Sequence, residues 1–464
     1  MNEARKIAMP KNTISHCIVW GFAVILTVTM LVTDEVDVLI RISAISGLAL
    51  ALFATRLLPE IVTAFGCFLA FIMINAAPND IIFSGFASGG FWLLFAGLII
   101  GTAISATGLG MQFALRIFEK TGDSYIKAAL LLALSGLGLG LLVPSTMPRI
   151  IILMPIALSL SKTMGYGIGS LGHVGLTVTG AIATLLPTYA ILTANLPTII
   201  HFGAFESLYD IQPSYARYFI EQAPANTVRF MVLLALMLPF ASARSDTTSV
   251  LDAPTPFTYT QFKLLILLGL AILFWALDTF HGISPAWVAL SLAAVLLIPG
   301  FGILDSNVMK TKIDMSPAFF IVAVFAISAV AQHTGLGTVV ADRLIPVLGL
   351  GQGSDLRDLY SVFGLSTVLS HLTTAPAAPA ILAPLAGAIA AETGWSIETI
   401  AMAQVLGIST PLLPYQAPPL IIAMALAKIP MIALLRVCLW LAVAVAVLGV
   451  PITYFWWSYL GMFI

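Results

Sequence analysis

Residues 143–157 read VPSTMPRIIILMPIA, and residues 372–386 read LTTAPAAPAILAPLA. Each stretch interrupts a long apolar run with proline and small hydroxyl side chains. Proline lacks the backbone N–H that a helix needs and clashes with the preceding turn, so each stretch predicts a break inside a hydrophobic segment. We therefore expect two re-entrant hairpins, at 125–162 and 358–391, that turn back at these stretches.

Shorter motifs recur around the two stretches at one spacing. The tetrapeptide TGLG occurs at 107–110 and again at 334–337, and LLP occurs at 185–187 and again at 412–414, in both cases 227 residues later. Matched halves with broken apolar segments in corresponding positions are typical of secondary transporters. The order of the motifs therefore predicts two repeats of one design.

The composition excludes a soluble protein. The chain has 464 residues, of which 60% are hydrophobic and only 9% are charged, whereas soluble domains carry about 25% charged residues. The apolar runs are long and continuous, which favours helices over the alternating strands of a membrane barrel. We expect an all-α polytopic membrane protein in a lipid bilayer, and the net charge of −1 gives no reason to expect a nucleic-acid partner.

About eleven transmembrane helices are predicted in addition to the two hairpins. Two of them, at 172–203 and 397–428, contain proline and polar residues midway and are expected to be broken helices. The other nine are apolar segments near 20 residues long, at about 16–33, 38–55, 60–77, 90–106, 227–244, 262–278, 284–300, 315–332 and 431–457. Non-helical backbone at membrane depth must be buried in protein or line a cavity, so the four interruptions should meet.

These segments define the expected domain organisation. Residues 1–36 hold a lead and an extra first helix, residues 37–250 form the first repeat, and residues 251–464 form the second. Lys and Arg residues gather on one side if the N-terminus is cytoplasmic and the C-terminus outside, as in a bacterial inner membrane. The repeats are then inverted, and the basic residues placed outside are Arg41, Arg217, Arg229, Arg343 and Arg357.

Arg149 is the basic side chain that we place near the membrane interior, at the start of the helix after the first break. Ionisable residues at that depth are expensive and mark function. A helix N-terminus and a guanidinium both favour an anion, and the guanidinium can hold a carboxylate with two hydrogen bonds. Neither interrupted stretch carries Asp or Glu. The alternative is an arginine that reaches the cytoplasmic face or bonds local carbonyls.

Hydroxyl and amide side chains at the four interruptions complete the candidate anion site, since both groups can bond an oxyanion. Each one alone could equally form a helix–helix hydrogen bond. For His333 and His371 we favour packed, hydrogen-bonded imidazoles. The predicted substrate-binding residues are Ser145, Thr146, Arg149, Thr193, Asn195, Thr373, Thr374, Tyr415 and Gln416.

With these features the chain resembles the divalent-anion:sodium symporter family. The family carries Ser-Asn-Thr at each hairpin tip, ten residues before a proline. Counting back from Pro155 and Pro384 places Thr146 and Ala375 where the asparagines would be. The first tip, PSTMPR, is similar to the PSNTAR form of the dicarboxylate-translocator branch, with Arg149 matching its arginine, and TANLP at 193–197 is loosely similar to another stretch of that branch.

The resemblance implies a homodimeric secondary transporter that works by an elevator motion. Its implied substrate is a di- or tricarboxylate, with sulfate or a sulfonate as the alternative. The implied coupling ion is sodium, with anion exchange as the alternative, and no other cofactor or metal is expected. Residues that the resemblance implies for the cation are Ser145, Thr146, Thr184, Thr374, Ala375 and Ser409. No catalytic motif suggests an enzyme, and paired broken hairpins favour closed gates over an open channel.

Overall fold

The computed structural model describes residues 37–118, 124–143, 145–240, 255–305, 307–311 and 313–463. These residues form helices joined by short turns, and no strand occurs among them. The all-helical prediction is therefore confirmed. The predicted segment at 16–33 lies outside the described residues.

The described residues of the first half form eleven helical elements before α11 (Tyr215–Met237). They are α2 (Val38–Thr55), α3 (Glu60–Met73), α4 (Asn79–Ile82), η1 (Ser84–Ala87), α5 (Gly89–Thr107), α6 (Leu109–Phe118), α7 (Tyr125–Leu142), α8 (Thr146–Thr163), α9 (Leu171–Ala183), η2 (Pro187–Ala190) and α10 (Leu196–Tyr209). Helix α11 and the short η3 (Leu238–Phe240) then lead to the second half.

The described residues of the second half form fourteen helical elements, of which the fifth to the eleventh follow the order of α5 to α10. They are α12 (Tyr259–Ala276), α13 (Asp278–His281), α14 (Pro285–Leu297), α15 (Val308–Thr311), α16 (Ser316–His333), α17 (Leu336–Leu348), α18 (Asp355–Leu372), α19 (Pro379–Thr393), α20 (Ile397–Ile408), η4 (Pro414–Gln416), α21 (Pro418–Ala427), α22 (Met431–Ala444), η5 (Val445–Gly449) and α23 (Val450–Tyr459). Helices α5 and α16 begin 227 residues apart, as do α6 and α17.

Four irregular segments lie where the sequence predicts interruptions. The first tip (residues 143–145, of which the structure describes 143 and 145) joins α7 to α8, and the second tip (residues 373–378) joins α18 to α19. The first break (residues 184–195) separates α9 from α10, and the second break (residues 409–417) separates α20 from α21. Each LLP motif leads into the short 3₁₀ helix of its break, whose first residue is the proline.

The TGLG motif forms the same turn in both halves. Gly108 and Gly335 have φ of +67° and +76°, a left-handed conformation that favours glycine. The second glycines, Gly110 and Gly337, lie against Ile152 of α8 and Pro384 of α19. The motif thus turns the chain sharply and packs it closely against the returning helix of each hairpin.

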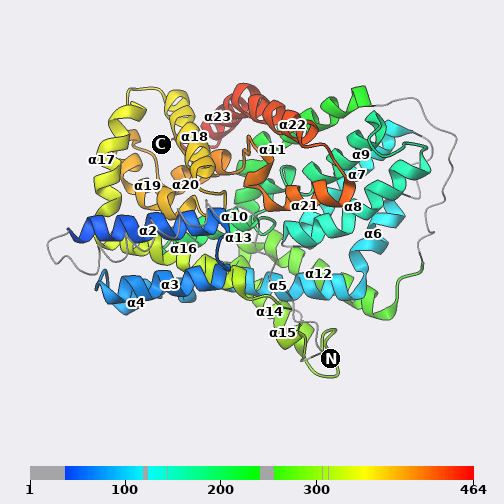
Figure 1. The fold of residues 1–464 in the computed structure, drawn as a ribbon, viewed down its shortest axis with the longest axis horizontal. Coiled ribbons are helices and arrows are strands. Elements are labelled where there is room, and N and C mark those ends of the chain that lie inside the picture. Colours follow the sequence, from blue (N-terminus) through cyan, green and yellow to red (C-terminus); the bar gives the residue numbers. More distant parts are fainter. Residues whose placement is uncertain are drawn as a thin grey trace.

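The two halves interlock at the broken helices. Helix α7 packs against α9 and α18 packs against α20, within their own halves. The later pieces cross over, since α10 packs against α19 and α20, and α21 packs against α8 and α9. Figure 1 shows the hairpin helices of the two halves near opposite ends of the long axis, with α10 and α21 between them.

Eight described helical segments are long and apolar enough to cross a membrane, or nine if α19 and α20, which meet at 118°, form one span. The predicted segments at 60–77 and 284–300 are the shorter helices α3 and α14. The predicted start of the span at 227–244 is wrong, because α11 begins at Tyr215. The first half of α11 has a buried polar face, so hydrophobicity does not mark its beginning.

Candidate anion-binding site

Arg149 lies in the first turn of α8, directly after the first tip, and is fully buried at 0% exposure. Its Nε donates to the carbonyl oxygen of Ser145 at 3.1 Å. Its Nη2 donates to Thr146 Oγ1 at 2.8 Å, to the carbonyl oxygen of Ala194 at 2.6 Å and to Asn195 Oδ1 at 3.1 Å. The guanidinium therefore joins the first tip to the first break and does not reach the surface.

The other terminal nitrogen of Arg149 has no partner. Its Nη1 is buried and makes no hydrogen bond to any described residue. It lies beside Gly140 of α7, where a Cβ atom would come within 2.9 Å of it. None of the ion pairs between described residues at Arg56 and Arg217 involves Arg149, and its guanidinium contacts no described carboxylate. A buried cation without a carboxylate is costly, so two buried N–H groups and one positive charge remain available to an anion.

Two helices begin beside this guanidinium. Ser145 precedes α8 and Asn195 precedes α10, and neither side chain caps its own helix. The side chain of Asn195 instead accepts from Thr146 Oγ1 at 3.0 Å and donates to Thr188 Oγ1 at 3.1 Å. Uncapped N-termini present N–H groups and partial positive charge, so their position strengthens the attraction for an anion at Arg149.

The remaining predicted residues of the first half are also buried. Thr193 lies within the first break, beside the carbonyl group that Arg149 bonds. Thr184 lies at the end of α9, and its Oγ1 donates to the carbonyl oxygen of Ala181 at 2.8 Å. The structure thus gathers the first-half candidates around one network.

In the second half, Gln416 ties the second break to the second hairpin. Its Oε1 accepts from the backbone N–H groups of Leu412 and Leu413, both at 3.1 Å, and its Nε2 donates to the carbonyl oxygen of Ser370 at 3.2 Å. His371 Nε2 accepts from the same Leu412 N–H at 3.0 Å. Gln416 therefore bonds only the protein itself in this conformation.

The other candidates of the second half are less enclosed. Thr373 and Thr374 are half-buried, and Ala375 is buried in the second tip. The carbonyl oxygen of Thr374 accepts from two backbone N–H groups of the turn, at 2.9 Å each. Tyr415 belongs to η4, but its side chain lies outside the described residues.

The two histidines differ. His371 is hydrogen-bonded as expected, since its Nδ1 bonds the carbonyl oxygen of Thr367 and its Nε2 accepts from Leu412. The expectation of a packed His333 is wrong, because this side chain is exposed. His333 is the last residue of α16, where the helix ends at the TGLG turn.

A second buried arginine lies outside the residues predicted for the site. Arg229 of α11 is 1% exposed, although we placed it on the outer side of the membrane. Its Nη1 donates to Asn226 Oδ1 at 2.7 Å, and its Nη2 donates to Ser409 Oγ at 2.7 Å and Thr410 Oγ1 at 2.9 Å. Gln222, Asn226 and Arg229 have the spacing of one helical face, which could have signalled a buried polar stripe.

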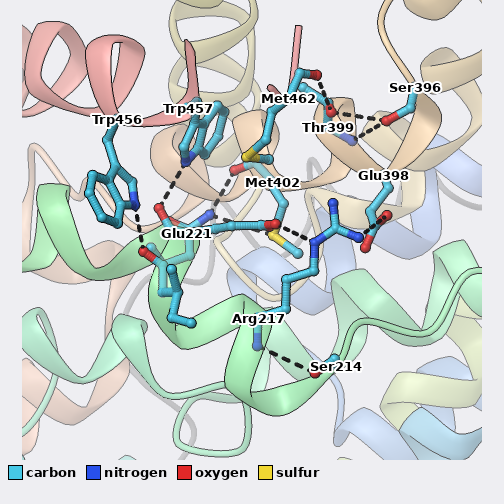
Figure 2. Close-up of polar contacts among 12 residues, drawn as sticks. Ser214, Arg217, Glu221, Ser396, Glu398, Thr399, Met402, Trp456, Trp457 and Met462 are labelled. Carbon is cyan, nitrogen blue, oxygen red and sulfur yellow. Dashed lines mark hydrogen bonds and ion pairs between the residues drawn. The ribbon is translucent and has the colours of Figure 1, made fainter. Parts of the chain in front are cut away.

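Helix α11 holds the two breaks together. The hydroxyl of Tyr218 donates to the carbonyl oxygen of Tyr189 in the first break at 2.6 Å. Arg229 bonds the second break, and Gln222 Nε2 donates to the carbonyl oxygen of Met402 in α20 at 3.0 Å. Near the start of α11, Arg217 forms an ion pair with Glu398 of α20 at 3.1 Å (Figure 2).

The C-terminal helix fastens α11 from its other side. Figure 2 shows Trp456 and Trp457 pointing from α23 toward α11. Their indole nitrogens donate to the carbonyl oxygens of Ile220 at 3.0 Å and Glu221 at 2.9 Å. Pro224 has no N–H for the carbonyl of Ile220, so Trp456 supplies the donor that the helix lacks.

The four interruptions are connected by hydrogen bonds within each half and through α11 between the halves. Each hairpin bonds the break of its own half, through Arg149 beside the first tip and through Ser370 and His371 in the last turn of α18, just before the second tip. The two breaks are linked through α11. Within the described ranges, no hydrogen bond runs directly from one tip to the other.

Paired broken helices around buried, uncompensated guanidinium groups in an apolar helical protein define a multi-pass membrane transporter of anions. The chain matches the family described as the sodium:sulfate symporter transmembrane region over residues 8–463. It belongs to this family, which confirms the resemblance found in the sequence. The protein is accordingly a transporter and not an enzyme.

Several individual proteins are similar to the chain. A membrane protein of Cupriavidus necator is 24% identical over 350 residues, which cover 72% of this chain and 68% of the relative. An L-tartrate/succinate antiporter of Escherichia coli is 24% identical over 278 residues, 54% of each chain, so the match spans about half the length of that relative. The crystal structure of the YdaH transporter of Alcanivorax borkumensis has the same fold, with a TM-score of 0.57, 18% identity and coverage of 83% of this chain and 89% of that one.

Proposed function

We propose that the protein carries a small dianion across the membrane by alternating access, with di- and tricarboxylates as the preferred class. The observation that carries this proposal is the unpaired Nη1 of buried Arg149. A carboxylate there would accept its two free N–H groups in a charge-assisted geometry. The Escherichia coli relative is named for tartrate and succinate, which are both four-carbon dicarboxylates.

Further side chains complete the proposed site. Ser145, Thr146, Thr193 and Asn195 are the first-half ligands, and Thr373, Thr374, Tyr415 and Gln416 are those of the second half. In the structure, the side chains of Gln416 and Asn195 bond other groups of the protein. When substrate enters, we expect some of these hydrogen bonds to be replaced by bonds to its carboxylates. Thr373 and Thr374 are half-buried and could face the second carboxylate directly.

The wider arrangement follows from the family resemblance. We propose inverted repeats over 37–250 and 251–464, a cytoplasmic N-terminus, a bacterial inner-membrane location, and a homodimer in which hairpins and broken helices move as an elevator. The repeated order of elements supports the two repeats. Sodium symport and exchange of one dianion for another are the two couplings suggested by the family description and by the relative's name.

Uptake of radiolabelled succinate into proteoliposomes tests the substrate class. We expect saturable uptake that unlabelled tartrate, malate or citrate inhibits and that Arg149→Ala abolishes. Arg343→Ala is the matched control, because Arg343 is exposed on α17. Inhibition and transport by sulfate alone would replace the carboxylate assignment with the sulfate alternative, and uptake that survives Arg149→Ala would contradict the proposed site.

A further inference from the structure

The C-terminal end of α20 has the composition of an alkali-cation site. Half-helix ends and unwound carbonyls at broken helices are where transporters bind sodium. Here the carbonyl oxygen of Leu406 and the hydroxyls of Ser409 and Thr410 converge on one point, at the negative end of the helix dipole. The resemblance implied Ser409 as a sodium ligand for the same chemical reason.

Arg229 already supplies a cation at this point. Its Nη2 lies 3.3 Å from the carbonyl oxygen of Leu406, 2.7 Å from Ser409 Oγ and 2.9 Å from Thr410 Oγ1. The residue is 1% exposed. A sodium ion on the same oxygens would have to sit against a guanidinium, and like charges at that distance repel strongly in a buried setting.

The first tip does not fit a sodium ion either. The carbonyl oxygen of Ser145 and Thr146 Oγ1 both accept hydrogen bonds from Arg149. Three of the six residues that the resemblance implied for sodium, namely Ser145, Thr146 and Ser409, therefore contribute oxygens that bond a guanidinium. These oxygens can bind a cation, and the cations that they bind in the structure are the guanidinium groups of Arg149 and Arg229.

The two arginines are not equivalent in their use of donors. Arg149 keeps an unpaired Nη1, which leaves it able to bind a substrate. Both terminal nitrogens of Arg229 are engaged with protein oxygens. Arg149 thus suits an anion-binding role, and Arg229 suits the role of a fixed charge that neutralises the end of α20.

We infer that Arg229 is a tethered cation that takes the place of a coupling sodium ion at the second break, so that the transporter exchanges one dianion for another and moves no sodium. This inference rests on the proposed dianion transport. The positive charge of Arg229 is part of the chain and is not released with the substrate. A sodium gradient therefore cannot drive the cycle, and the gradient of the counter-substrate supplies the driving force.

The first test uses the wild-type protein in proteoliposomes. Uptake of radiolabelled succinate is compared in sodium and N-methylglucamine buffers, with and without unlabelled succinate inside. We expect uptake that requires internal dianion and changes less than about twofold when sodium is removed. A fall of about tenfold or more without sodium, which is the loss of a strong charge-assisted contact, would overturn the inference, as would accumulation in vesicles that contain no dianion.

The second test removes the tethered cation. In Arg229→Ser we expect exchange in sodium-free buffer to fall about tenfold or more, and millimolar sodium or guanidinium to restore it. A purely structural arginine would not create sodium dependence. Arg229→Lys keeps a cation and should stay sodium-independent, and Arg343→Ser is the exposed control. Undiminished exchange in Arg229→Ser without either cation would overturn the role of Arg229.

A substrate-free readout separates this inference from the proposed function. The melting temperature of the purified wild-type protein is measured in sodium and in potassium at equal ionic strength. We expect no difference, even if succinate is the wrong substrate and no dianion is transported. A sodium-specific rise in the melting temperature of the wild-type protein would overturn the tethered-cation assignment, and this measurement does not require Arg229→Ser to fold.

Discussion

The first and second breaks share a backbone plan but use their arginines differently. In the first break, Arg149 comes from the hairpin of the same half and leaves one nitrogen unpaired. In the second break, Arg229 comes from α11, outside that half's hairpin, and both its terminal nitrogens bond protein oxygens. The two breaks therefore have similar backbones but different charge patterns. The guanidinium of Arg149 has a nitrogen free to bind a ligand, whereas both terminal nitrogens of Arg229 bond the protein.

The largest effect on transport is expected for Arg149→Ala, which should behave differently from Arg229→Ser. Arg149→Ala should lower dianion exchange about a hundredfold or more, because it removes the charge and leaves the carbonyl of Ala194 without its buried donor. Added sodium should not rescue it, in contrast to Arg229→Ser. Initial exchange rates at equal protein density measure this. Rescue of both variants by sodium would show that the two arginines have equivalent roles.

The next effect contrasts two glycines at matching positions, Gly180 of α9 and Gly407 of α20. A Cβ at Gly407 would lie 2.5 Å from Ser366 Cβ and 2.6 Å from the carbonyl oxygen of Phe363, and backbone cannot give way easily. A Cβ at Gly180 would meet the mobile end of Met154 at 2.9 Å. We expect Gly407→Ala to lower the free energy of unfolding by about 1–3 kcal/mol.

Gly180→Ala should be nearly neutral, because the gain in helix propensity of about 1 kcal/mol offsets a small clash. Unfolding in mixed detergent micelles measures both variants. Equal losses of stability in the two would mean that the hairpins pack equally tightly on both broken helices.

A third effect concerns the link between the end of α18 and the second break. Gln416→Leu leaves the N–H of Leu413 and the carbonyl of Ser370 without their partner, so we expect a loss of about 1–3 kcal/mol in the free energy of unfolding. Unfolding in mixed detergent micelles measures this variant, and an unchanged free energy of unfolding would contradict the hydrogen-bond assignment.

The smallest effect is expected at His371. The N–H of Leu412 has two acceptors, His371 Nε2 and Gln416 Oε1. His371→Leu should therefore reduce the free energy of unfolding by less than about 1 kcal/mol. Combined with Gln416→Leu, the loss should exceed the sum of the single losses, since both acceptors disappear. Strict additivity would show that the two side chains act independently.

The tips and breaks could be predicted because local chemistry determines them. Proline cannot continue a helix, and the first glycine of each TGLG adopts a positive φ in both halves. These constraints depend on neighbours in the sequence, and the structure has turns at the same residues.

Arg229 was missed for a physical reason. Hydrophobicity locates a helix by its lipid-facing surface, but the first part of α11 packs against protein along Gln222 and Asn226. Its pairing with α20 joins residues about 180 positions apart in the chain. Such long-range pairing leaves no mark in the local sequence beyond the spacing of the polar residues, whereas the position of Arg149 beside a proline break is a local signal.

The contacts between α11 and α20 have a mechanical consequence. Arg217 bonds Glu398, Gln222 bonds Met402, and Arg229 bonds Ser409, so three rungs fix the two helices side by side in the same direction. Trp456 and Trp457 fasten α23 to the same assembly. Sliding between packed helices requires contacts that can be exchanged with little change in energy, whereas sliding at the two buried rungs would leave the polar groups of Gln222 and Arg229 without partners. Under the proposed alternating access, we therefore expect sliding to occur outside this assembly, with α11, α20 and α23 moving as one body.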